Sequence, residues 1–300
     1  LTVYAGLLKK GGVPFTGDVR AALKGSDYST PNFKEAVLFD RFWTDLHPYL
    51  PPSLGVYLDT AHGYALRLEA RLPEGSVFLD PDDDTTTHWK DGFSDLVLRA
   101  IADIHGRFRG RTDKLKQTGY FWTCTSETMM QAQDLWAALL SFMEAKCASV
   151  LGDRGPRHRA ILDSLPTWYA EVDTQPKTLL YGDVNPQNIA FAATGDGYEV
   201  SLFDWERATL SLGERDLAEH LIYTLPNGFA ETEARAAIAT YRDALSDAGS
   251  DHAFEARLHW SLQDLILNRL PLMLLVNEVA GKRRHAGTAY VNAHCLLDML

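Results

Sequence analysis

The chain has 300 residues and a formal net charge of −11, and 46% of its residues are hydrophobic. A chain of this length and composition suggests two domains or one bilobal unit with a sizeable core. The acidic balance disfavours nucleic acid as a partner, because phosphate backbones are bound by basic faces, and it is compatible with a cationic small substrate.

The sequence shows no targeting or membrane segment. No apolar run of about eighteen residues is present, so no membrane span is expected. Cys124, Cys147 and Cys295 have wide and unpatterned spacing, which argues against a disulfide framework or a zinc site and favours a reducing, cytoplasmic location. The chain begins at Leu1 rather than Met, in what reads as the middle of a strand, so we expect further residues before it.

The N-terminal part is predicted to combine short strands with one helix. The segment LTVYAGLLKK (1–10) is rich in strand formers and alternates weakly, which predicts a strand. Residues 30–46 carry apolar side chains at three- and four-residue steps, the period of an α-helix. Residues 53–60 and 63–72 then read as an antiparallel strand pair joined by a short turn.

An acidic, proline-containing segment, residues 73–87, is the best candidate for a linker. Its acidic run could attract a cationic substrate, but such runs more commonly form solvated loops. The chain that follows reads as mainly helical, and a long helix from about 252 to 280 should bend near Pro271. These patterns predict a small strand-rich domain over 1–72 and a larger helical domain over 73–300.

The helical part is interrupted at residues 179–208 by a strand, a loop and a hairpin with polar residues at the corners. Gly182 and an Asn-Pro pair end the first strand, so Asp183 and Asn188 fall in the loop before the hairpin. Asp204 follows the second hairpin strand. Because a hairpin brings its two ends together, these two carboxylates and the carboxamide can converge at one end.

This arrangement suits phosphoryl transfer from a nucleotide. Asp183 would orient the attacking hydroxyl or accept its proton, and it precedes Asn188 by the D-x-x-x-x-N spacing of kinase catalytic loops. Asn188 and Asp204 offer the oxygen ligands that Mg²⁺ prefers, and the metal offsets the charge of the phosphates. Each residue alone could serve a turn or a helix start, so the order and spacing of all three carry the prediction.

The stretches YGDVNPQNIAF and VSLFDWERA resemble the signature of aminoglycoside phosphotransferases and choline-kinase-like enzymes. The family patterns are H-G-D-x-x-x-x-N, matched by Gly182, Asp183 and Asn188, and D-W-E or a close variant, matched by Asp204 and Trp205. The resemblance implies an α+β, protein-kinase-like bilobal fold. It also implies an ATP- and Mg²⁺-dependent transfer of phosphate to a hydroxyl of a small molecule.

The resemblance further implies a strand lysine that contacts the phosphates and pairs with a helix glutamate. Lys9 or Lys10 supplies the lysine, and strand alternation allows only one of them to face the cleft; we prefer Lys9. Glu35 is the implied partner. Residues 66–72 fall where the family hinge receives the adenine. The family's glycine-rich loop is not visible, so the domain over 1–72 is expected to lack its first strands.

Tyr181 departs from the family pattern, whereas His105 and Asp216 match it and are interpreted as structural residues. Tyr181 stands where the family usually has histidine, although its hydroxyl can still donate a supporting hydrogen bond. His105 is expected to be structural, and Asp216 is expected to hold the catalytic loop. The alternative function is a pseudokinase that binds nucleotide or a partner without turnover. The acceptor (aminoglycoside-like, amino alcohol or sugar alcohol), the choice of ATP or GTP, and the oligomeric state are left open.

Overall fold

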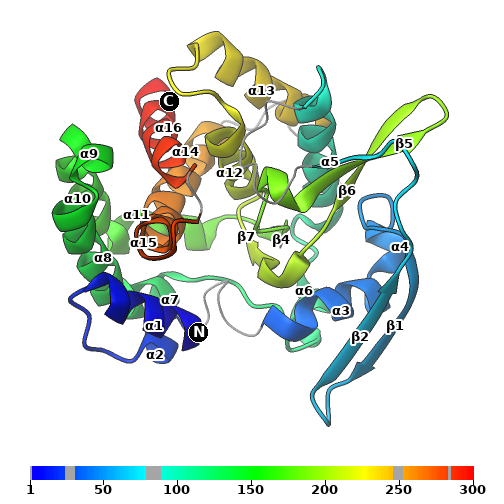
Figure 1. Cartoon of the computed structure of the whole chain (residues 1–300), viewed down its shortest axis with the longest axis horizontal. Coiled ribbons are helices and arrows are strands. Elements are labelled where there is room, and N and C mark those ends of the chain that lie inside the picture. Colours follow the sequence, from blue (N-terminus) through cyan, green and yellow to red (C-terminus); the bar gives the residue numbers. More distant parts are fainter. Residues whose placement is uncertain (1, 24–30, 79–88, 246–252, 283–284) are drawn as a thin grey trace.

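A strand-containing N-terminal region adjoins a larger, mainly helical part in the computed structural model of the chain (Figure 1). The observed secondary structure agrees with the predicted α+β class. The acidic run of the predicted linker, Asp80 and Asp82 to Asp84, lies outside the described residues. The structure describes residues 2–23, 31–78, 89–245, 253–282 and 285–300.

The elements follow one another in chain order as two short helices, a helix pair and a hairpin, and then the mainly helical part. The N-terminal elements are α1 (Thr2–Gly11), α2 (Val19–Ala22), α3 (Pro31–Arg41), α4 (Trp43–Leu46), β1 (Ser53–Asp59) and β2 (Tyr64–Glu69). Next come β3 (Val77–Phe78), α5 (Phe93–Phe108), α6 (Asp113–Gln117), α7 (Ser126–Gln131), α8 (Gln133–Lys146), α9 (Ala148–Leu151), α10 (Gly155–Asp163), α11 (Leu165–Thr174), β4 (Thr178–Leu180), β5 (Ile189–Thr194), β6 (Gly197–Leu202) and β7 (Thr209–Ser211). The last helices are α12 (Glu214–Thr224), α13 (Glu231–Ala244), α14 (Phe254–Asp264), α15 (Leu270–Ala280) and α16 (Ala286–Met299).

The first residues form a helix, so the prediction of a strand over 1–10 is wrong. Helix α1 packs on α15, and Lys10 Nζ donates to the carbonyl oxygen of Val279 at 3.2 Å. Leu8 is buried, which shows that tertiary packing overrides the weak strand preference of this segment. The predicted boundary at residue 72 stays a prediction, although α1 and α2 both pack on helices that follow it.

The predicted antiparallel pair β1–β2 is present, with Tyr57 opposite Leu66. Its inner face packs on α3. The predicted linker is only partly a linker, because it contains β3, in which Val77 pairs with Phe191 of β5. Strand β3 therefore extends the hairpin β5–β6 to a three-stranded sheet, with the order β3-β5-β6.

The predicted hairpin β5–β6 is confirmed, with Ile189 opposite Leu202. This register brings the two ends of the hairpin together, and the Phe203 N–H donates to the carbonyl oxygen of Asn188 at 2.9 Å. Strand β4 leads into the loop that precedes the hairpin and pairs with β7. The loop and the segment after the hairpin therefore lie side by side.

Helix α12 lies at the centre of the helical part and is buried along most of its length. It contacts α5, α13, α14 and α16. Its buried residues include three carboxylates, Glu214, Asp216 and Glu219. Buried charges are tolerated only where they are paired or hydrogen-bonded, so these side chains must have polar partners on the neighbouring elements.

The helix predicted over 252–280 is interrupted just before Pro271. Helix α14 ends at Asp264, α15 begins at Leu270, and the five residues between them form a π-helical turn, Leu265–Arg269. In this π-turn the Leu270 N–H bonds to the carbonyl oxygen of Leu265, five residues earlier. Proline has no N–H for an ordinary helical hydrogen bond, which explains why regular α-helix is lost here.

Helix α8 contributes several of its side chains, Trp136 among them, to the core. Across the described residues, no single helix has the length and apolar character to cross a membrane. One bent pair, Gln133–Lys146 with Ala148–Asp163, meets those criteria by length and composition only.

We predict that Gly182→Ala destabilises the protein by about 2–4 kcal/mol. The alanine would have to keep a left-handed backbone conformation, and its Cβ would clash with a neighbouring backbone atom. Gly182 has φ +79°, and a Cβ there would lie 2.6 Å from the carbonyl oxygen of Arg207. Gly228 is the matched control: its φ is +74°, and a Cβ there would meet no atom of the described residues within 4 Å. Gly228→Ala should cost about 1 kcal/mol. If urea unfolding showed equal losses of unfolding free energy for the two variants, the prediction would be contradicted.

Candidate active site

The loop that follows β4 is held by two buried carboxylates of α12. Asp216 accepts hydrogen bonds from the backbone N–H groups of Tyr181 (2.7 Å) and Gly182 (3.0 Å). Glu219, one turn further along, accepts from the Val184 N–H at 3.3 Å. The expectation that Asp216 holds the loop is confirmed, whereas the part of Glu219 was not predicted.

His105 has a structural position, in agreement with its interpretation from the sequence. Its ring is buried, with Nε2 3.1 Å from Asp216 Oδ2 and Nδ1 2.7 Å from the Tyr241 hydroxyl. When Nε2 donates to the carboxylate, Nδ1 is left to accept from the tyrosine. His105 therefore orients the carboxylate of Asp216 and does not reach the loop itself.

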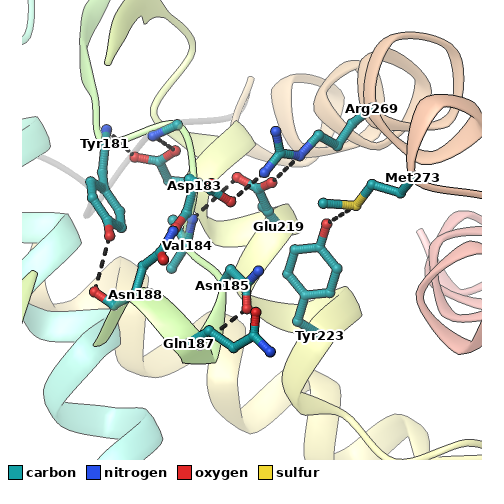
Figure 2. A network of polar contacts seen from close by, with 12 residues as sticks. Tyr181, Asp183, Val184, Asn185, Gln187, Asn188, Glu219, Tyr223, Arg269 and Met273 are labelled. Carbon is teal, nitrogen blue, oxygen red and sulfur yellow. Dashed lines mark hydrogen bonds and ion pairs between the residues drawn. The ribbon is translucent and has the colours of Figure 1, made fainter. Parts of the chain in front are cut away.

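Tyr181 connects the loop to the segment that carries Asp204. Its hydroxyl contacts the carbonyl oxygen of Phe203. It also lies 3.1 Å from the carbonyl oxygen of Asn188 (Figure 2). Burial, followed by the charges of nearby carboxylates, raises the pKa of Tyr181 well above its ordinary value, so the hydroxyl stays protonated and can donate. The tyrosine thus supplies the supporting hydrogen bond that the sequence left in question.

Asp183 lies in this loop with only 4% of its surface exposed. Its carboxylate forms an ion pair with Arg269, at the end of the π-turn (Figure 2). The side-chain amide of Asn188 donates to the Asp183 backbone carbonyl at 3.4 Å. This bond uses Nδ2 of Asn188, so Oδ1 is the atom that could coordinate a cation.

Asp204 adopts a strained backbone conformation at the other end of the hairpin. Among the described residues it is the only one besides glycine with a positive φ, at 59°. The N–H of the next residue, Trp205, donates to Glu35 Oε1 at 3.2 Å, which helps to hold the segment. Partial burial, followed by the charges of Glu206, Asp183 and Glu35, raises the pKa of Asp204 to about 6. The negative charges around Asp204 make this corner a favourable place for a cation.

The cation paired with Glu35 is Arg67 and not the predicted Lys9. Arg67, on β2, forms ion pairs with Glu35 and with Glu69, the latter at 2.9 Å. Lys9 lies exposed in the last turn of α1, beside α15, and on the other side of the molecule from β2 (Figure 1). The expected Lys9–Glu35 pair is therefore not formed, since Lys9 is on a helix where a strand was predicted, and Lys10 is on the same helix.

The residues predicted to bind metal form an incomplete ligand set. Asn188 and Asp204 supply one amide oxygen and one carboxylate, and the described residues contain no group of three or more His, Cys, Asp or Glu residues placed to hold a metal ion. Mg²⁺ is commonly bound by one or two carboxylates while waters and substrate phosphates complete its shell. The two residues and the raised pKa of Asp204 fit such an ion.

A cavity of about 830 Å³ opens beside these residues. One side is formed by residues 71–76 and Phe78, and the other includes Gln187, Ile189 and Phe203. Gln187 and Phe203 directly precede Asn188 and Asp204 in the sequence. The cavity thus adjoins the predicted metal ligands, and the segment predicted as a hinge ends in its wall.

Three residues at this site were not predicted, and for one of them the sequence contains a signal. Arg269 is the one charged residue in LILNRLPLMLLV (265–276), and a lone cation in an apolar run must be buried with a partner. Arg67 and Glu219 lie in segments with several charges, and no pattern there distinguishes them. The pairs of Arg67 with Glu35 and of Glu219 with Arg269 join residues of different elements, which no local pattern connects.

Comparison with known proteins identifies the class. Residues 91–253, more than half of the chain, match the model of the phosphotransferase enzyme family (APH). The chain therefore belongs to that family, and the resemblance to aminoglycoside phosphotransferases and choline-kinase-like enzymes is confirmed. No curated protein sequence matches the chain.

Solved structures show a kinase-like fold. An ethanolamine kinase from Plasmodium vivax superposes with a TM-score of 0.51 at 14% identity, covering 90% of this chain and 73% of that one. A choline kinase from Streptococcus pneumoniae gives 0.43 at 14% identity, covering 95% and 85%. A macrolide 2'-phosphotransferase from Brachybacterium faecium gives 0.42 at 14% identity, covering 88% and 81%. At this identity the first match establishes the fold and not a substrate.

We predict that Tyr181→Phe lowers the rate of phosphoryl transfer about tenfold, because the loop loses its hydroxyl link to the Phe203 carbonyl. The control is Tyr169→Phe, at another fully buried tyrosine, on α11, which is not part of this loop. Tyr169→Phe should keep the wild-type rate. Equal rates for the two variants, measured as initial rates of ADP release, would contradict the role given to Tyr181.

Proposed function

We propose that the protein is an ATP- and Mg²⁺-dependent phosphotransferase that phosphorylates a hydroxyl group of a small molecule. The observation that carries this proposal is the meeting of Asp183, Asn188 and Asp204 around one corner beside the cavity. Membership of the phosphotransferase family supports the reaction class.

The cavity is the proposed site of the nucleotide base. Residues 71–76 offer backbone donors and acceptors along one wall, and Phe78, which is 65% exposed, offers a ring against which a base can stack. The opposite wall leads through Gln187 and Phe203 to the predicted metal ligands. A nucleotide in this position would direct its phosphates towards Asn188 and Asp204.

The metal and the loop would share the work of transfer. Oδ1 of Asn188 and the carboxylate of Asp204 would hold Mg²⁺, which would offset the negative charge of the phosphates. Asp183 would orient the acceptor hydroxyl and take its proton as the hydroxyl oxygen bonds to the γ-phosphorus of ATP and the bond from that phosphorus to the leaving ADP breaks. Glu35 and Arg67 support the backbone beside Asp204, since Glu35 accepts from the Trp205 N–H.

The acceptor that we propose to test first is an amino alcohol. The structure with the highest TM-score of the three is named an ethanolamine kinase, and the net charge of −11 would attract a cationic acceptor. An aminoglycoside and a sugar alcohol are the next candidates.

The three free cysteines support a reducing, cytoplasmic location. We do not propose the pseudokinase alternative. The presence of Tyr181 in place of the family histidine favours it, but the Tyr181 hydroxyl makes the supporting contact with the Phe203 carbonyl oxygen.

The test is to incubate purified protein with Mg²⁺, ATP and each acceptor, and to detect by mass the product that gains one phosphate. Asp183→Asn should lower kcat about 10³-fold, because the carboxylate that takes the hydroxyl proton is lost. The control is Asp196→Asn at the exposed turn of the same hairpin, which should leave kcat unchanged. A fully active Asp183→Asn variant would contradict the proposal.

We predict that Phe78→Ala raises the Kd for ATP about tenfold, a loss of about 1.4 kcal/mol in binding, because a base would lose a stacking surface. Tyr64→Ala is the matched control: Tyr64 is also an exposed aromatic residue, at 65%, but it lies on β2 before the segment 66–72 and does not line the cavity. Tyr64→Ala should leave the Kd unchanged in calorimetric titration. Equal Kd values for the two variants would argue against a base beside Phe78.

A further inference from the structure

We propose that Arg269 is a positioning residue that fixes the carboxylate of Asp183 for transfer, and that the π-turn directs Arg269 to it. This role rests on the proposed function. Arg269 ends the π-turn between α14 and α15 and lies 86 residues after Asp183 in the sequence.

The contacts of Arg269 are buried and involve two acids at once. One guanidinium nitrogen pairs with Asp183 Oδ1, and Nε lies 3.0 Å from Glu219 Oε1 (Figure 2). The exposed fractions of the three side chains are 3% for Arg269, 6% for Asp183 and 0% for Glu219. A planar guanidinium can serve two carboxylates in fixed directions, whereas a lysine ammonium is a point charge.

Glu219 links this pair to the backbone of the loop. Its second oxygen accepts the Val184 N–H, so one carboxylate contacts both Arg269 and the residue next to Asp183. The backbone of the loop and the side chain of Asp183 are thereby held against the same two groups. Because Arg269 contacts Oδ1 of Asp183, the proposal assigns Oδ2 to the acceptor hydroxyl.

The π-turn explains how Arg269 comes to face α12. On α12, Arg215 and Glu219 are four residues apart and share one face. Arg215 pairs with Asp264, and Glu219 pairs with Arg269, which lies five residues after Asp264. In a regular α-helix two residues five apart point about 140° away from each other, so both could not face the same helix.

The wider π-turn reduces this divergence, since it has more residues per turn and bonds five residues apart. Asp264, which ends α14, and Arg269, which ends the π-turn, can then both face α12. The π-turn therefore allows a helical segment of the core to hold the loop that carries Asp183. π-Helical turns of this kind are found frequently at functional sites.

Arg269→Lys tests the proposal, because it keeps a positive charge in the core but cannot hold two carboxylates in fixed directions. The assay uses wild-type protein and variants with Mg²⁺, ATP and whichever of ethanolamine, choline, an aminoglycoside or a sugar alcohol the wild type phosphorylates. We expect kcat to fall between about tenfold and a hundredfold, while the KM for ATP stays within about threefold of wild type. Arg269→Met should lower kcat further if it folds.

Asp264→Asn is the matched control, since it weakens the neighbouring ion pair between Asp264 and Arg215 and leaves the side chains of the Arg269–Asp183 pair unchanged. It should lower the unfolding temperature and leave kcat unchanged below that temperature. A wild-type kcat for Arg269→Lys, or an equal loss of kcat in Asp264→Asn, would overturn the positioning role alone. A wild-type protein that phosphorylates none of the acceptors would contradict the proposed function and this role with it.

Discussion

The geometry of the site depends on two buried carboxylates of α12 that accept hydrogen bonds from backbone N–H groups of the loop that carries Asp183. A loop with glycine and proline cannot satisfy its own N–H groups by regular structure, and buried N–H groups are costly when unpaired. Asp216 takes two of them and Glu219 takes a third. Charge-assisted hydrogen bonds of this kind are stronger than neutral ones, so α12 fixes the loop to the helical core. The position of Asp183 follows from that attachment.

The second constraint is electrostatic. Asp183, Asp204, Glu35 and Glu206 lie close enough together for their charges, added to partial burial, to raise the pKa of Asp204 to about 6. Arginines offset two members of this group. Arg67 pairs with Glu35. Arg269 pairs with Asp183 (Figure 2). Asp204 directly follows Phe203, which lines the cavity. A divalent ion beside Asp204 would offset the charge of these carboxylates, which is the physical basis for proposing that Asn188 and Asp204 bind magnesium.

The ion pair of Arg67 with Glu35 takes its cation from a different element than the pair that the family resemblance implied. The family resemblance led us to expect a lysine from the start of the chain, whereas the structure pairs Glu35 with an arginine on the strand hairpin that follows α3. Glu35 then accepts the Trp205 N–H, so the pair supports the strained residue Asp204 through its neighbour. Residues 1–10 instead form α1 and pack on α15.

The sequence by itself determined the local elements of this protein: the hairpin β5–β6, the loop with Asp183 and Asn188, and the interruption near Pro271. Each depends on residues close together in the chain, such as Gly182 and the Asn-Pro pair after it, which end the first strand. The tertiary structure alone decided that residues 1–10 are helical and which cations face the acids. Weak strand preference gave way to packing on α15, and the partners of Glu35 and Asp183 lie 32 and 86 residues away in the sequence. Such pairings depend on how helices and strands are brought together, and no local pattern of residues encodes them.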